Sequence, residues 1–465
     1  MTEETQMHRS ISRMKVGFRI FLWATFAVVL LGFAERAEAR SVVLISVDGM
    51  RPDTITRADQ LGLKVPNLRR MMREGVYAEG VSGVVPTVTY PSHTTLITGV
   101  SPAKHGIYSN TTFDPEQKNL QGWYWYSEDI KVPTLWDLAR TAGLSTASVN
   151  WPVSVGAKVD YLIPEVWRAG TEDDRKLVRS LSTPGMLAKL ESELGPFAEE
   201  LNTDLLNDRI RAKFAIAIIQ KYRPKLITVH LASLDHVEHQ FGPFSAEANQ
   251  VMEASDELVG KLWEAALSVD PETVFCVVSD HGFAPIHGRL NLFVAFVQGG
   301  LLRPGTAKTM FGTPAVESWD AMPWANGGSA AIVLRDPQDA ALISKTRDLL
   351  MKLAGDPDNG INRIVEAQEL HELGGYPTAS FLVDMKPGFQ TDRGFTGALR
   401  GDGGGGTHGY LPEHVEMRAS FFIAGHGIAH SRNLGVVDMR QIAPTIADLL
   451  GLKMPTAEAK PLPVQ

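Results

Sequence analysis

The stretch from Pro86 to His93 combines a hydroxyl residue with a restricted backbone. Thr89 precedes an aromatic–proline pair, and a proline on either side of it limits the backbone angles that it can adopt. Residues 94–98 are predicted to form a helix that ends at Gly99. Thr89 is therefore expected near a helix N-terminus, where free backbone N–H groups favour an anion. An ordinary proline-rich turn would show the same pattern. Polar residues elsewhere in the chain therefore decide whether this stretch is a catalytic site or only a turn.

Three short apolar segments each lead to an aspartate. Their composition, rich in valine and isoleucine, predicts buried parallel strands. The strands and their aspartates are residues 41–47 with Asp48, 226–232 with Asp235, and 274–278 with Asp280. A lone aspartate in this position would be read as a turn or capping residue. Because ligands of open α/β sheets gather at the carboxyl ends of the strands, three such aspartates indicate a shared site.

Histidines accompany these aspartates. Asp235 and His239 are four residues apart, which places both on one face of a helical turn. His281 follows Asp280 directly, and His408 stands near the end of the glycine-rich stretch 401–410, where glycine permits a close backbone approach. Imidazole and carboxylate groups together suit zinc. Six such ligands and a threonine oxygen exceed what one zinc ion binds, but they fit two.

Two metal ions about 4 Å apart can stabilise both the attacking and the leaving oxygen of a phosphoryl displacement. Contact with such an ion would also lower the pKa of the Thr89 hydroxyl and make it a nucleophile. From residue types alone, scattered structural residues remain an equal alternative to this site.

Six ordered motifs resemble the nucleotide pyrophosphatase/phosphodiesterase family of the alkaline phosphatase superfamily. They are Asp48-Gly49-Met50-Arg51, Thr89-Tyr90-Pro91-Ser92-His93, His105-Gly106-Ile107 with Asn110, Asp235 to His239, Asp280-His281-Gly282, and Thr407-His408-Gly409-Tyr410. The stretch Asp438 to Leu450 is also similar to this superfamily. The chain departs from many relatives in having Ser92 where they have asparagine, and it lacks their additional extracellular modules and cysteines.

The resemblance implies a site with two Zn²⁺ ions. Asp235, His239 and His408 would hold one ion. Asp48, Asp280 and His281 would hold the other, with Thr89 on that second metal. Asn110 would donate a hydrogen bond to a phosphoryl oxygen, and Tyr108 and Tyr161 are candidates for stacking on a base or an aromatic leaving group, although ordinary packing explains both tyrosines equally well.

The alternation of strands and helices predicts an α/β fold with a mostly parallel central sheet and helices on both faces. The resemblance implies that this sheet is arranged as in alkaline phosphatase. Within a catalytic domain at 40–465, the segment at about 290–400 has shorter elements and frequent glycine and proline, so we expect an inserted smaller subdomain there. The basic start, the apolar run 20–34 and Ala37-Glu38-Ala39 predict a signal peptide at 1–39. We therefore expect a periplasmic or secreted protein, with an uncleaved membrane anchor as the alternative.

The formal net charge of −8 argues against a nucleic-acid-coating role, and the single cysteine excludes an intrachain disulfide. The leading expectation is a hydrolase that splits small-molecule phosphodiester or pyrophosphate bonds, including nucleotide substrates, through a phosphothreonine intermediate. The alternatives are a related hydrolase of phosphonoacetate, phosphomonoesters, phospholipid head groups or sulfate esters, and a non-catalytic metal-binding protein. The sequence does not set the leaving group, the physiological substrate or the oligomeric state.

Overall fold

The structure is a computed structural model that describes residues 40–119, 122–167, 171–197, 205–308 and 314–465. The signal peptide expected at 1–39 lies outside the described residues. Arg40 to Gln465 form one compact unit. In the described part of the chain, no helix has both the length and the apolar character that a membrane crossing requires.

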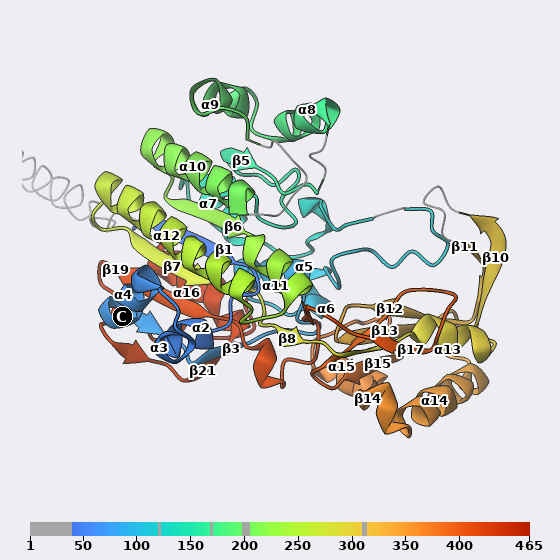
Figure 1. The fold of residues 1–465 in the computed structure, drawn as a ribbon. Coiled ribbons are helices and arrows are strands. Elements are labelled where there is room, and N and C mark those ends of the chain that lie inside the picture. The colour runs from blue at the N-terminus through green and yellow to red at the C-terminus, as the bar shows by residue number, and fades with distance from the viewer. Residues whose placement is uncertain (1–39, 120–121, 168–170, 198–204, 309–313) are drawn as a thin grey trace, which may run out of the picture. The chain divides into compact units, whose positions relative to one another are not determined.

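An eight-stranded sheet forms the centre of this unit, in the order β20-β2-β19-β7-β1-β6-β4-β5 (Figure 1). Its strands are β1 (Val42–Val47), β2 (Val76–Tyr77), β4 (Thr146–Val149), β5 (Tyr161–Ile163), β6 (Leu226–Leu231), β7 (Val274–Val278), β19 (Phe421–Gly425) and β20 (Arg432–Asn433). β1 pairs in parallel with β6 and β7, and β4 pairs in parallel with β6 and β5. β19 runs antiparallel to both its neighbours, β7 and β2. The predicted, mostly parallel sheet is confirmed.

Helices cover both faces of this sheet. Val43, Ile45 and Val47 of β1 belong to a core that includes residues of α4, α10, α11 and α12, whereas Val42 and Leu44 belong to a second core with residues of α5, α7 and α16. Alternate residues of one strand are therefore buried on opposite faces, which explains the continuous apolar run. These helices are α4 (Pro66–Glu74), α5 (Thr89–Thr98), α7 (Leu135–Thr141), α10 (Leu205–Tyr222), α11 (Ser233–Phe241), α12 (Ala246–Val269) and α16 (Ile442–Leu449).

The segment at about 290–400 builds its own small sheet, in the order β12-β13-β15-β14, with antiparallel pairing throughout. Two further hydrophobic clusters lie here, and they are made largely of residues from this segment. Its elements are α13 (Leu292–Gln298), β10 (Leu302–Lys308), β11 (Pro314–Trp319), β12 (Ala321–Ala325), β13 (Ser329–Leu334), α14 (Ala340–Ala354), β14 (Ile361–Glu366), α15 (Ala367–Glu372), β15 (Phe381–Met385) and β16 (Phe389–Thr391).

Short elements connect these layers. They are α2 (Asp53–Thr56), α3 (Ala58–Leu61), β3 (Gly80–Ser82), α6 (Pro102–His105), α8 (Glu172–Leu181), α9 (Met186–Leu194), β8 (Ala284–Pro285), β9 (Gly288–Leu290), β17 (Arg400–Asp402), β18 (Gly406–Thr407) and β21 (Val436–Asp438), with single 3₁₀ turns at Ser127–Asp129, Pro357–Asn359, Val415–Met417 and Met439–Gln441.

Candidate active site

The carboxyl ends of three adjacent strands bring the predicted ligands to one edge of the sheet. Asp48 follows β1, and Asp280 and His281 follow β7, the strand beside β1. On the other side of β1, β6 leads into α11, which carries Asp235 and His239. The helical turn that their spacing predicts is therefore present.

Thr89 is the first residue of α5. Val88 before it has an extended backbone, and Gly99 ends the helix with a φ of 69°, in the left-handed region that glycine favours. All ten residues of α5 are buried, so the helix is firmly held. The Thr89 hydroxyl oxygen lies 3.5 Å from His281 Nε2. The predicted position of Thr89 at a helix N-terminus is confirmed.

Asp48, Asp280 and His281 form the inner group of candidate ligands. His281 Nε2 lies 3.1 Å from Asp280 Oδ2 and 3.4 Å from Asp48 Oδ1. All three side chains are buried, with at most 3% of any of them exposed. The ligand atoms of these three residues lie within 4.8 Å of one another, which is close enough to bind one ion.

Asp235, His239 and His408 form the outer group of candidate ligands. Asp235 Oδ1 is 3.5 Å from His239 Nε2 and 3.5 Å from His408 Nε2. The His239 side chain is 41% exposed and that of Asp235 is 18% exposed, so this is the open side of the cluster. The His408 ring stacks on the His281 ring with centroids 3.7 Å apart. Ligand atoms of Asp235, His281 and His408 also lie within 4.8 Å of one another, so His281 touches both groups.

Each of the three histidines directs Nε2 at this cluster, because its Nδ1 contacts a backbone carbonyl. The Nδ1–oxygen distances are 3.1 Å to Gly406 for His239, 3.2 Å to Gly282 for His281 and 3.0 Å to Thr87 for His408. A carbonyl only accepts hydrogen bonds, so Nδ1 carries the proton and Nε2 keeps a free lone pair. This is the tautomer that a metal ligand needs.

The charges of the cluster are unbalanced without a cation. Burial and neighbouring carboxylates raise the pKa of Asp48 and of Asp280 well above the usual range for aspartate. Burial lowers the pKa of His281 well below the usual range and lowers that of His408 to about 4. Three buried carboxylate oxygens of this cluster have no hydrogen-bond donor: Asp48 Oδ1, Asp235 Oδ1 and Asp280 Oδ2. These are the oxygens that face the histidine Nε2 atoms, so the donor set fits divalent metal ions.

Further polar contacts hold the inner carboxylates. His230 Nε2 lies 3.0 Å from Asp48 Oδ2, and His230 Nδ1 lies 2.7 Å from Glu165 Oε2. The backbone N–H of Gly49 donates to Asp280 Oδ1 over 3.2 Å. Sequence analysis missed His230 and Glu165. The one available signal was a histidine inside the apolar strand 226–232, and nothing in the sequence connects it with a glutamate 65 residues away.

The glycine-rich stretch approaches α11 closely, as expected. Gly405 has a φ of 71°, and a Cβ atom there would lie 2.0 Å from the backbone oxygen of His239. A side chain at this position would push His408 and His239 apart. Glycine is therefore needed where the loop delivers His408 to the outer group.

Asn110 lies beside Thr89. Its Oδ1 accepts a hydrogen bond from the Tyr90 backbone N–H over 2.9 Å. Since an N–H group bonds only to the amide oxygen, the amide orientation is fixed and the Nδ2 donor remains on its other side. Tyr108, two residues earlier, is half-buried, packs on the cluster containing Trp324 and Tyr376, and has Lys131 Nζ 5.9 Å from its ring centroid.

The structure does not bring Tyr161 to this site. Tyr161 begins β5, the strand at the sheet edge, and pairs with Ala147 near the start of β4. Asp48 follows the opposite, carboxyl end of the parallel strands. The Tyr161 ring stacks on Tyr222 with centroids 4.3 Å apart. These contacts assign Tyr161 to packing. Aromatic rings nearer to Thr89 belong to Tyr90 and Trp123, whose centroids are 5.3 Å apart.

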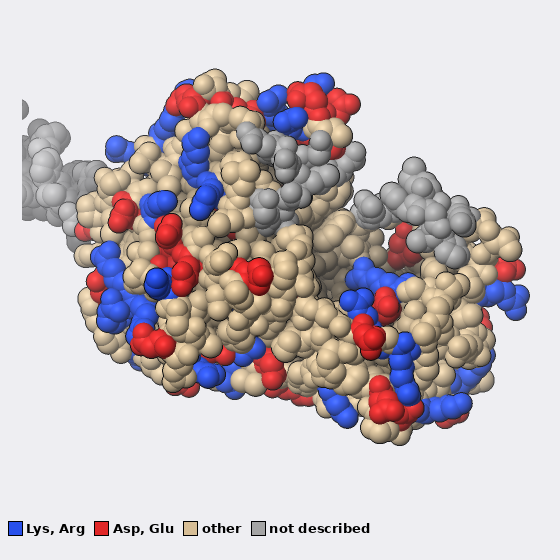
Figure 2. Space-filling model, viewed as in Figure 1, with Lys and Arg blue, Asp and Glu red and all other residues tan. Residues whose placement is uncertain are grey.

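On the face of the molecule seen in Figure 2, acidic and basic side chains are intermixed around tan surface, without an extended basic area. This agrees with the net charge of −8.

The fold is that of an α/β protein, and the carboxyl edge of its sheet carries a candidate metal-binding cluster of carboxylate and imidazole groups. A sequence model described as type I phosphodiesterase / nucleotide pyrophosphatase matches residues 42–411. The chain belongs to this family.

Similar curated proteins carry related names. An uncharacterized pyrophosphatase/phosphodiesterase of Schizosaccharomyces pombe is 28% identical over 247 residues, which are 53% of this chain and 45% of that protein. Venom phosphodiesterase 2 of Crotalus adamanteus is 23% identical over 429 residues, 90% of this chain and 46% of that protein. The chain thus spans less than half the length of these relatives.

Solved structures share the fold. Human ectonucleotide pyrophosphatase/phosphodiesterase 5 superimposes with a TM-score of 0.62 at 17% identity and covers 92% of this chain and 97% of its own. The murine protein, solved as an inactive threonine-to-alanine variant in complex with AMP, has a TM-score of 0.63 at 17% identity and the same coverage.

Proposed function

We propose that this chain is a metal-dependent phosphodiesterase or nucleotide pyrophosphatase with Thr89 as its nucleophile. One observation carries the proposal: the Thr89 hydroxyl lies 3.5 Å from His281 Nε2, within the cluster of carboxylate oxygens that have no donor. A hydroxyl beside such a cluster can attack a bound electrophile once a neighbouring positive charge lowers its pKa.

The proposed reaction has two steps at phosphorus. The Thr89 oxygen bonds to phosphorus while the bond from phosphorus to the leaving oxygen breaks, which gives a phosphothreonine. Water then cleaves that ester and restores the threonine. The open side of the cluster at His239, 41% exposed, gives substrate and water a route to the buried hydroxyl.

Two Zn²⁺ ions are proposed as the cofactors. The residues that would hold them are Asp48, Asp280 and His281 for the inner ion and Asp235, His239 and His408 for the outer ion. Bound ions would supply the positive charge that lowers the pKa of the Thr89 hydroxyl and stabilises charge on the leaving oxygen.

Asn110 is proposed to hold the phosphoryl group. Its oxygen is occupied by the Tyr90 backbone N–H, so its Nδ2 is the group that remains to donate to a non-bridging oxygen. A fixed donor of this kind stabilises charge as it develops in the transition state.

Diesters are favoured over monoesters by the contacts of Arg51. A positively charged side chain such as arginine would stabilise the extra charge of a phosphomonoester. Arg51 is the arginine nearest in sequence to Asp48. Its Nε and Nη2 donate to Asp53, and its Nη1 donates to the Phe283 carbonyl oxygen over 2.9 Å. The guanidinium of Arg51 therefore fixes the loop after β1 and is not free to bind a phosphomonoester.

The names of the relatives support a nucleotide substrate. The murine structural neighbour is described in complex with AMP, as an inactive threonine-to-alanine variant. By analogy with that complex, we propose a small-molecule phosphodiester or a nucleotide as the substrate of this chain. A periplasmic or secreted location is part of the same proposal, and it rests on the basic–apolar–small pattern of residues 1–39.

Three substrates assayed side by side test the proposal: bis(4-nitrophenyl) phosphate, 4-nitrophenyl phosphate and a dinucleotide pyrophosphate, each with chelator-treated and with zinc-reloaded protein. We expect turnover of the diester and the pyrophosphate only after zinc is restored, with the monoester at least about a hundredfold slower. Preference for the monoester, or activity that survives complete metal removal, would contradict it.

A further inference from the structure

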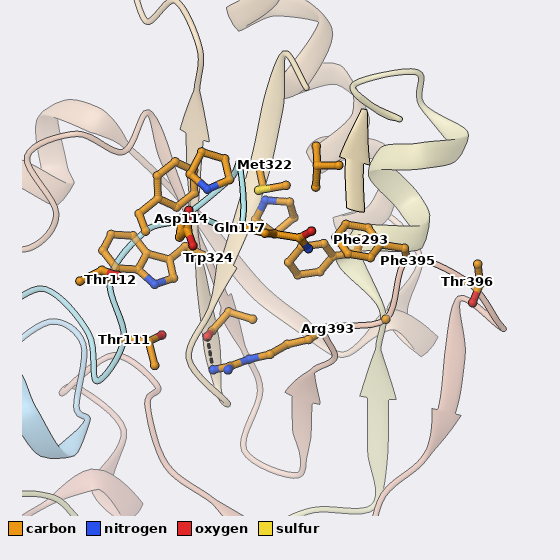
Figure 3. A pocket seen from close by; sticks show the side chains of 16 residues that line it. Thr111, Thr112, Asp114, Gln117, Phe293, Met322, Trp324, Arg393, Phe395 and Thr396 are labelled. Atoms are coloured by element: carbon orange, nitrogen blue, oxygen red, sulfur yellow. Dashed lines mark hydrogen bonds between the residues drawn. The ribbon is translucent and has the colours of Figure 1, made fainter. Parts of the chain in front are cut away.

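A pocket of about 560 Å³ lies between the loop 111–117 and the segment at about 290–400 (Figure 3). This volume is within the range typical of small-molecule sites. Its walls are largely aromatic: the rings of Phe113 and Trp324 have centroids 5.4 Å apart, and those of Phe293 and Phe395 lie 5.3 Å apart. Flat apolar surfaces on two sides suit a flat apolar group.

The pocket begins next to the candidate active site. Thr111, which lines it, is bonded directly to Asn110. Ala325 also lines it and precedes Asn326, whose Oδ1 accepts a hydrogen bond from Ser109. The same short segment, 109–111, therefore borders both the proposed phosphoryl site and the pocket, so a substituent on phosphorus can extend from one into the other.

Two hydrogen-bond donors with free capacity line this pocket, the Trp324 indole and the Arg393 guanidinium. Trp324 is 7% exposed, and its Nε1 has no hydrogen-bond acceptor. Arg393 is exposed, and its Nη2 donates to the Ala325 carbonyl oxygen over 2.7 Å, as the dashed line in Figure 3 shows. Among the residues that the structure describes, no carboxylate forms an ion pair with the Arg393 guanidinium. The pocket thus offers a positive charge and a buried N–H group.

Backbone N–H groups donate hydrogen bonds to the two nearby carboxylates, Asp114 and Asp392. Asp114 accepts the backbone N–H groups of Lys118 and Asn119 over 2.9 and 2.6 Å. Asp392 accepts the backbone N–H of Arg393 over 2.8 Å. Neither carboxylate side chain bonds to the guanidinium, so Arg393 remains available to an anion from solution.

We propose that this pocket is a subsite for one ester group of the substrate, and that it takes a flat apolar or aromatic group bearing an anionic carboxylate, sulfonate or phosphate. Arg393 and Trp324 Nε1 bind the anionic group, and Phe113 and Phe395 contact the flat body. The proposal that the bound group is part of the substrate rests on the proposed phosphodiesterase function. The proposal that the pocket binds a flat anionic group does not depend on that function.

The first test uses three 4-nitrophenyl phosphodiesters whose second ester group is methyl, phenyl or 4-carboxyphenyl. The zinc-loaded protein should prefer carboxyphenyl over phenyl by about tenfold or more in kcat/KM, since a charge-assisted hydrogen bond has that magnitude. Arg393→Met should abolish this preference and leave the methyl ester unchanged. Arg432→Met, on the edge strand β20, is the matched control and should change nothing. An unchanged carboxyphenyl preference in Arg393→Met would overturn the proposal.

The second test is independent of catalysis. Calorimetric titration of Thr89→Ala protein with naphthalene-2-sulfonate and with uncharged naphthalene-2-methanol should show about tenfold tighter binding of the sulfonate, and Arg393→Met should remove the difference. If no phosphodiester is cleaved but the sulfonate preference depends on Arg393, the proposed function fails and the pocket assignment stands. If all three diesters are cleaved equally and neither naphthalene probe depends on Arg393, the pocket assignment fails and the function stands.

Discussion

Asn110 offers the sharpest test of how the site holds a phosphoryl group. Its Oδ1 is fixed by the Tyr90 backbone N–H at 2.9 Å, so only Nδ2 is left to donate. Asn110→Ala removes that donor, and loss of one such donor costs about 2.7–4 kcal/mol, or roughly 10²–10³ in kcat. Asn110→Asp keeps the acceptor for Tyr90 and replaces the donor by a carboxylate that repels the substrate, so it should lose more activity than Asn110→Ala.

The assay is kcat on bis(4-nitrophenyl) phosphate for the parent and both variants, with metal content and thermal midpoint measured in each. Unchanged metal content separates a loss of substrate contact from a loss of the metal site. The reasoning is refuted if Asn110→Asp, with full metal content, keeps kcat within about tenfold of the parent, because a donor to phosphate would then be unnecessary.

Four further predictions concern the metal site and the leader. Dialysed protein should contain about two equivalents of zinc by elemental analysis, and His408→Ala should lose about one while the circular dichroism spectrum is retained. His230→Ala should weaken zinc binding about 10–100-fold in a chelator competition, because Asp48 loses the contact that orients it. The raised pKa values of Asp48 and Asp280 mean that these two carboxyl groups bind protons more tightly in the folded metal-free protein than in the unfolded chain, so their contribution to stability should fall as pH rises above about 4, the unfolded value. Zinc must displace those protons, so the gain in melting temperature on adding zinc should grow between about pH 5 and 8, and a pH-independent gain would contradict this. Export from a Gram-negative host should give a new N-terminus near Arg40 by mass measurement, whereas an intact leader in the membrane fraction would indicate an anchor.

The strands that carry ligands were predictable because each is an apolar run that ends in an aspartate. The run 274–278 coincides with β7, and 41–47 and 226–232 differ from β1 and β6 by one residue at one end. Local sequence carries this information, since burial on both faces requires continuous apolar residues. The order β7-β1-β6 that brings the three ends together depends on long-range pairing, which no single segment encodes.

Contacts across the fold account for what the sequence did not reveal. His230 faces Asp48 because β6 pairs with β1, and it meets Glu165 after the chain has left β5. Tyr161 was a candidate for stacking on substrate by its residue type, but the direction of β5 places it at the wrong end of the sheet. The composition of the segment at about 290–400 indicated shorter elements there, whereas its antiparallel sheet and the pocket beside Arg393 follow from packing.

The most direct test of the central claim is the turnover of a phosphodiester by Thr89→Ala protein that contains its full complement of metal. Thr89→Ser is the matched variant, since it keeps the oxygen and loses only a methyl group. If the Thr89 oxygen attacks phosphorus, Thr89→Ala loses several orders of magnitude in kcat while metal content is unchanged, and Thr89→Ser keeps much of the activity. Near-parental turnover by metal-replete Thr89→Ala would show that water is the nucleophile and would contradict the phosphothreonine mechanism.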